Sequence, residues 1–363
     1  MLVSLDQVNE RRADGRRQIE ICNACRYCEG FCSVFPAIAQ KRQFADGDLT
    51  QLANLCHNCR ACYHACQYTE PHEFALNLPR VLAELRVDSW ERFAWPGAFA
   101  RLFQQSGAAL GIAMALGFAA LLLALQTLQP ESGDGFYAHL AHGAMVAIFL
   151  PAFLLPLIVI GIGLRRYWRE VGGKAVTWSH LASAAINVAR LQELSGGQGQ
   201  GCNFEKEDRF SNARRHAHQA AMWGFFLCFA STASGTVLHY AGWPAPYAFL
   251  SLPKLLGVPG GLLLVVGALG LIVLKLKSDK TLGAPSVFGG EMGLVLMLLL
   301  TAASGLALYA ASGTTLVPPL LALHLGTVLA FFLTTPYSKM AHGFYRFAAL
   351  VRDAQIRATT TQR

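Results

Sequence analysis

Six long apolar stretches dominate the chain after residue 104. Each is close to the ~20 residues that an α-helix needs to cross a bilayer. The 363 residues are 53% hydrophobic and 14% charged, as expected for a polytopic membrane protein with a modest polar domain attached. The sequence therefore predicts a mainly α protein with a six-span transmembrane bundle. The predicted spans are 105–128, 137–164, 215–241, 255–275, 288–311 and 317–336.

Basic residues are distributed unevenly around these spans. They gather before residue 105, in 165–214, in 275–287 and in the tail after residue 337. Cytoplasmic loops of membrane proteins carry an excess of Lys and Arg, so these four segments and both termini are expected on the cytoplasmic side of an inner (cytoplasmic) membrane. The net charge of +8 is explained by this topology, and no nucleic-acid partner is expected.

Ahead of the spans, one cysteine run occurs twice. The spacing C-x2-C-x2-C-x3-C is typical of bacterial proteins that hold a pair of [4Fe–4S] clusters, in which the fourth cysteine of each run binds the other cluster. The predicted ligands of the first cluster are Cys22, Cys25, Cys28 and Cys66. The predicted ligands of the second are Cys56, Cys59, Cys62 and Cys32. Residues 1–104 are thus expected to form a ferredoxin-like cytoplasmic domain.

Zinc and disulfides explain these cysteines less well. Zinc sites usually combine two C-x2-C pairs and leave no use for a third cysteine at the same interval. Disulfides are not expected, because this part of the chain is predicted to face a reducing cytosol. Ser33 and Gln67 follow the two runs where ferredoxins usually have proline.

Histidines inside apolar spans are costly and are therefore candidates for function. His324 and His342 are 18 residues apart, which is five whole turns at 100° per residue. Both are predicted on one face of one helix, about 27 Å apart and near opposite surfaces of the bilayer. The alternative is that such histidines only join neighbouring helices by hydrogen bonds.

The third predicted span carries a second pair of histidines that could face His324 and His342. His218 lies near its start and His239 near its end. Two antiparallel helices with a histidine at each end can clamp two b-type haems, because each iron takes two axial imidazoles. The inner haem would use His218 and His342. The outer haem would use His324 with either His239 or His142, and the sequence does not choose between them.

The remaining sequence offers no flavin or nicotinamide site. The glycine-rich stretch 196–201 lacks the spacing of a dinucleotide fingerprint and follows no predicted strand. Segment 165–214 is predicted to be a partly helical cytoplasmic loop within the haem-binding domain 105–350. Residues 351–363 are predicted to be a polar tail.

The combination of a twin-cluster head and a histidine-bearing six-span domain resembles the tricarballylate (citrate) utilization protein B family. Matching motifs are R-R-x-x-H at 214–218, G-W-x-A-P-Y at 242–247 and H-G-x-Y-R at 342–346. The membrane part is also similar to the gamma subunit of respiratory nitrate reductase, which has a similar pair of histidines near its last span. Its other ligands lie closer together than the 21 residues between His218 and His239.

The resemblance implies an electron acceptor for a partner FAD-dependent dehydrogenase that oxidises tricarballylate to cis-aconitate. Electrons would pass through two [4Fe–4S] clusters and haem b, one or two per chain, to membrane quinone. Two alternatives stay open: a conduit from quinol to a soluble reductase of the heterodisulfide reductase type, and a membrane redox sensor or transporter. No nucleophile–base constellation for substrate chemistry is apparent in the chain.

Overall fold

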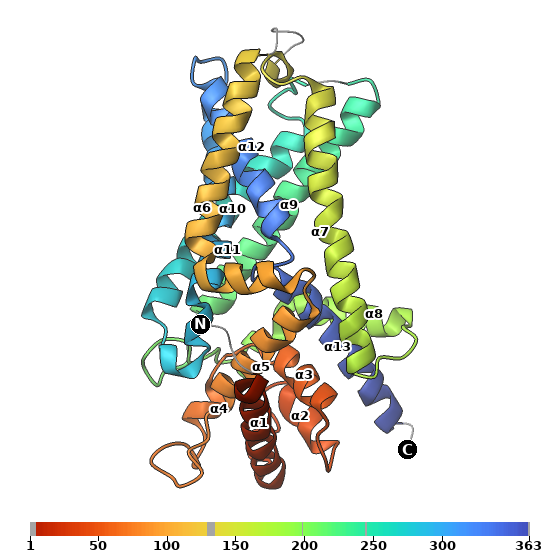
Figure 1. Ribbon diagram of the computed structural model, residues 1–363, viewed down its shortest axis with the longest axis vertical. Helices are drawn as coiled ribbons and strands as arrows, with labels where there is room; N and C mark the ends of the chain where they lie inside the picture. Colours follow the sequence, from red (N-terminus) through yellow and green to blue (C-terminus); the bar gives the residue numbers. More distant parts are fainter. Residues whose placement is uncertain (1–4, 129–134, 198, 244, 362–363) are drawn as a thin grey trace.

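The computed structural model describes residues 5–128, 135–197, 199–243 and 245–361, and these residues fold into helices without a named β-strand. The first four residues of the predicted head and the last two of the predicted tail lie outside this described part. A small helical head packs beneath one end of a bundle of long apolar helices (Figure 1). The prediction of a mainly α protein with a cysteine-bearing head and a six-span bundle is confirmed.

The head consists of α1 (Leu5–Cys25), α2 (Val34–Ala39), α3 (Asp46–Leu55), α4 (Ala61–His64) and α5 (Leu78–Phe93). Its core is formed by buried apolar side chains from α1, α2, α3 and α5, including Ile19, Leu49 and Leu82. Both cysteine runs lie where helices end and loops begin, as the end of α1 at Cys25 and of α3 at Leu55 illustrate. The helices thus hold the ends of the cysteine loops in place.

The bundle contains α6 (Gly97–Leu128), α7 (His142–Glu170), α9 (Ala213–Tyr240), α10 (Leu252–Lys277), α11 (Phe288–Ala310) and α12 (Val317–Thr334). All six are long and apolar enough to cross a membrane. α6 starts earlier than predicted and has non-helical backbone at Ser106. Its first part runs across the end of the bundle before the helix turns upright (Figure 1).

Two further helices lie on the head side of the bundle. α8 (Trp178–Arg190) falls within the segment 165–214, which is partly helical as expected. α13 (Ala341–Thr361) runs from the bundle along the head and packs against α8 and α3. Residues 351–361, which the sequence predicts to be part of a polar tail, continue this packed helix, and Val351 and Asp353 are buried in it.

One prediction about helix continuity is wrong. α12 ends at Thr334, and α13 begins only at Ala341. His324 and His342 consequently belong to two helices, and the argument that places them on one face of one helix fails. Pro336 stands between the helices, and because proline has no backbone N–H it cannot continue the hydrogen-bond ladder of α12.

Close backbone contact fixes α9 against α10. A Cβ added at Gly267 of α10 would lie 2.3 Å from the backbone nitrogen of Ala221 in α9. A Cβ at Gly224 of α9 would lie 2.5 Å from the nitrogen of Leu264. Small residues allow membrane helices to approach in this way, and here they set the position of the helix that carries His218 and His239.

We expect Gly267→Ala to destabilise the protein by about 1–3 kcal/mol, because the added methyl group meets backbone that cannot move aside. Thermal unfolding in detergent measures the effect. Gly117→Ala is the matched control, because a Cβ there would meet no atom within 4 Å. Equal melting temperatures for the two variants would contradict the proposed contact.

Candidate functional site

The eight motif cysteines line two neighbouring cavities in the head. One cavity, the first cysteine site, is lined by Cys22, Cys25, Cys28 and Cys66. The other, the second cysteine site, is lined by Cys32, Cys56, Cys59 and Cys62. Each set combines three cysteines of one run with the last cysteine of the other, the grouping that the spacing predicts. Cys62 also borders the first site, so the two sites adjoin.

The chemistry of these sites fits iron–sulfur clusters. Burial, followed by the neighbouring thiols, raises the pKa of Cys22 and Cys28 to about 12. Thiolates crowded in this way repel one another unless a cation neutralises them. In the described part of the chain, no three His, Cys, Asp or Glu side chains converge tightly enough to hold a single ion. Cysteines spread around a cavity suit a cluster of several irons better than one zinc ion.

Backbone N–H groups approach sulfur at both sites. The N–H of Asn58 donates to Cys56 Sγ at 3.3 Å, and that of Tyr68 donates to Cys66 Sγ at 3.4 Å. Hydrogen bonds to cluster sulfurs are one of the means by which proteins tune reduction potential. Asn58 also anchors its loop, because its side-chain amide donates to the carbonyls of Pro79 and Leu282.

The predicted inner haem ligands lie together. The ring centres of His218 in α9 and His342 in α13 are 6.0 Å apart. A metal–imidazole bond is about 2 Å long and the ring centre lies about 1 Å beyond, so two axial imidazoles on one iron have centres about 6 Å apart. His342 Nδ1 bonds to the carbonyl of Lys339, which leaves Nε2 free of that proton, as in metal-binding histidines. His218 Nδ1 is buried without a partner among the described residues. The separation of the two rings, whose planes are 86° apart, fits two axial imidazoles on one haem iron.

At the far end of the bundle, the structure brings His142 and His239 together. Their rings stack with centres 4.1 Å apart, and Tyr137 lies against both. This spacing is too small for an iron between the two rings as they stand. The third candidate, His324, bonds through Nδ1 to Ser304 of α11 at 3.1 Å. The choice of outer haem ligands stays a prediction.

A polar cavity lies between the second cysteine site and His342. His57 lines both this cavity and the second site, and burial places the pKa of His57 well below its usual value. Charged residues surround this cavity, and of these the sequence singles out Arg214 and Arg346 only as parts of the family motifs. The charged residues are Arg60, Arg86, Arg214, Lys275, Asp279, Lys280, Glu291, Lys339 and Arg346.

The arginines and the histidines have a simple relation in sequence. Arg214 precedes His218 by four residues, and Arg346 follows His342 by four, so each arginine lies one helical turn from a histidine. Burial lowers the pKa of Arg346 to about 9. Because this value is still above neutral pH, the guanidinium stays charged. This i,i+4 spacing is the signal by which sequence alone could have found both residues.

The comparisons with known proteins agree with this architecture. The family model for citrate utilization protein B matches residues 98–362, and the model for its Fer4-like domain matches residues 15–91. A citrate utilization protein B from Escherichia coli is 42% identical over 361 residues, covering 98% of this chain and 95% of the relative. No solved structure matches the chain. The predicted resemblance is therefore confirmed, and the chain belongs to the citrate utilization protein B family.

Proposed function

We propose that this multi-pass membrane protein reoxidises the reduced flavin of a partner FAD-dependent dehydrogenase and passes the electrons to membrane quinone. The partner's reaction is the oxidation of tricarballylate, or a related carboxylate, to a product such as cis-aconitate. The name of the E. coli relative, a citrate utilization protein, supports this substrate class. The chain itself binds no substrate in this proposal.

The observation that carries the proposal is that the two cysteine sites, the polar cavity and the histidine pair adjoin one another in space. The first cysteine site reaches the surface at the exposed Cys25. It adjoins the second site, His57 links the second site to the polar cavity, and His342 lines that cavity opposite His218. When bound, two [4Fe–4S] clusters and a b-type haem would supply one-electron carriers that divide the two electrons of a flavin hydroquinone.

The protein's own residues position the proposed clusters and haem. The cysteines hold the two cluster sites at the head, and His218 and His342 offer axial nitrogens at the junction of head and bundle. The head and both described chain ends lie on the same side of the bundle (Figure 1). Together with the basic segments, this arrangement supports a cytoplasmic head and cytoplasmic termini in the inner membrane.

The test is to count metals and then follow electrons. Protein purified in mild detergent should contain about eight irons per chain and haem b. Anaerobic addition of the reduced partner should bleach the broad cluster absorbance and produce a reduced haem band, and a soluble quinone analogue should reverse both changes. Zinc in place of iron would refute the proposal. Reduction by quinol alone, with onward transfer to the oxidised flavoprotein, would instead favour the reverse direction.

A further inference from the structure

The two cysteine sites have different electrostatic surroundings. The first site is lined by aromatic, apolar and uncharged polar side chains besides its cysteines, and no Arg, Lys, Asp or Glu occurs among the lining residues that the structure describes. The second site is lined by Arg60, His57 and Glu193 in addition to its cysteines. This difference is a property of the chain's own residues, whatever the sites hold.

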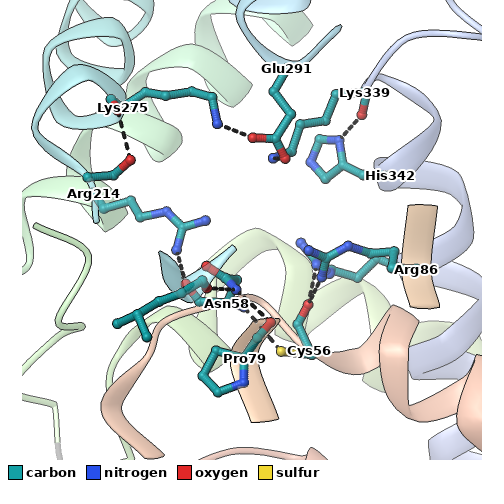
Figure 2. A network of polar contacts seen from close by, with 12 residues as sticks. Cys56, Asn58, Pro79, Arg86, Arg214, Lys275, Glu291, Lys339 and His342 are labelled. Carbon is teal, nitrogen blue, oxygen red and sulfur yellow. Dashed lines mark hydrogen bonds and ion pairs between the residues drawn. The ribbon is translucent and has the colours of Figure 1, made fainter. Parts of the chain in front are cut away.

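Three further arginines bind the loop of the second site. Arg86 of α5 and Arg346 of α13 both donate to the carbonyl oxygen of Cys56, at 2.5 and 2.6 Å. Arg214 of α9 donates to the carbonyl oxygen of Asn58 at 2.7 Å. Figure 2 shows the guanidinium groups of Arg86 and Arg214 approaching the loop from different sides. We call Arg86, Arg214 and Arg346 the loop arginines.

The loop arginines lack close counter-charges. Their hydrogen bonds to the loop go to carbonyl oxygens and, from Arg86, also to the side chain of Cys56, and none forms an ion pair with a carboxylate in the described part of the chain. The carboxylate of Glu291 in the same cavity is held by Lys275 and Lys339. Glu193 is the one acidic side chain among the described residues that line the second site, where it accepts the N–H of Ser33. Positive charge therefore exceeds negative charge around this site.

Such an excess matters for an anionic group. A [4Fe–4S] cluster with four thiolate ligands is negative and becomes more negative when it gains an electron, and its potential depends on net charge and solvent exposure. At the effective dielectric constant of about 20 that suits protein interiors, one unit charge within about 10 Å changes such an equilibrium by at least about tenfold. The three loop arginines outnumber the one carboxylate at the second site, so their net effect is to raise the reduction potential there.

We propose that the loop arginines give the second cysteine site the higher reduction potential of the two, so that electrons move from the exposed site inward. One electron leaves the first site, which is oxidised, and enters the second, which is reduced, without any change of protonation. The proposal rests on the proposed function in requiring that both sites hold clusters. It adds the direction in which electrons run within the head.

Redox titration monitored by EPR tests the role of charge. Arg346→Gln should weaken electron binding at the second site about tenfold, which is about 59 mV for a one-electron couple. Arg346→Lys keeps the charge and should retain most of the wild-type potential. Arg26→Gln, an exposed arginine beside Cys25, is the control and should leave the second site unchanged. Equal shifts for the Gln and Lys variants would show that Arg346 acts only as a structural support, and this would overturn the proposal.

A second measurement needs no arginine variant. Cys59 lines only the second site and Cys25 only the first. The higher-potential signal of the wild-type protein should be damaged by Cys59→Ser and retained in Cys25→Ser. The opposite assignment would refute the inference while leaving the electron-transfer function intact. A preparation without iron would refute the function itself, so the two failures are distinguishable.

Discussion

Replacing His342 with alanine is expected to remove the haem at the junction of head and bundle while leaving the iron–sulfur content unchanged. The ring of His342 is the partner of His218 at a centre-to-centre distance of 6.0 Å, and a b-type haem with two axial imidazoles needs both. The cysteine sites do not depend on this side chain, because their lining residues do not include it. Haem per chain and iron per chain, measured on the same sample, give the answer.

The matched control is His216→Ala. His216 lies two residues before His218 on α9 and is exposed, so its loss should leave the haem in place. His218→Ala should reproduce the His342→Ala result, whereas His142→Ala, at the other end of the bundle, should not. Full haem content in His342→Ala would show that His218 has a different partner.

Local sequence patterns were enough to predict the spans and the way the cysteines group around two cavities. Hydropathy over ~20 residues identifies a bilayer-crossing helix, and all six predicted spans correspond to long apolar helices. The grouping of Cys66 with Cys22, and of Cys32 with Cys56, follows from the known exchange of the fourth cysteine between two runs. The same groupings line the two cavities.

The histidine geometry was harder to predict, because helix periodicity applies only where a helix continues. The break between Thr334 and Ala341 removes the basis for placing His324 and His342 on one helical face. His342 nevertheless lies beside His218, because α13 begins close to the end of the bundle at which α9 starts. Pro336, which has no backbone N–H to continue a helix, is a local sign of this break that the spacing argument did not use.

The loop arginines show what a single sequence cannot provide. Arg86 and Arg346 meet at the carbonyl of Cys56 although 260 residues separate them along the chain. Their convergence depends on how α5 and α13 pack around the head. Only the i,i+4 relation of Arg214 and Arg346 to the two histidines is visible locally.

The second large effect is expected at Glu291, whose carboxylate lies between the ammonium groups of Lys275 and Lys339 (Figure 2). These residues join α10, α11 and the segment between α12 and α13. Glu291→Gln should destabilise the protein by about 3–5 kcal/mol, because it leaves two partly buried lysines unpaired. The nearby loop arginines add to the repulsion. The measurement is chemical or thermal unfolding in detergent, with Glu207→Gln, an exposed residue, as the control.

A triple variant separates charge pairing from packing at this position. Glu291→Leu combined with Lys275→Met and Lys339→Met removes all three charges and keeps most of the side-chain volume, so it should recover much of the lost stability. Stability equal to that of Glu291→Gln would show instead that the cost comes from packing.

Haem binding should respond to Glu291→Gln as well, since the carbonyl of Lys339 is the partner of His342 Nδ1. Glu291→Gln is therefore expected to loosen haem binding at His342 without changing the iron content of the head, and this ties the buried ion pairs to the orientation of the axial ligand.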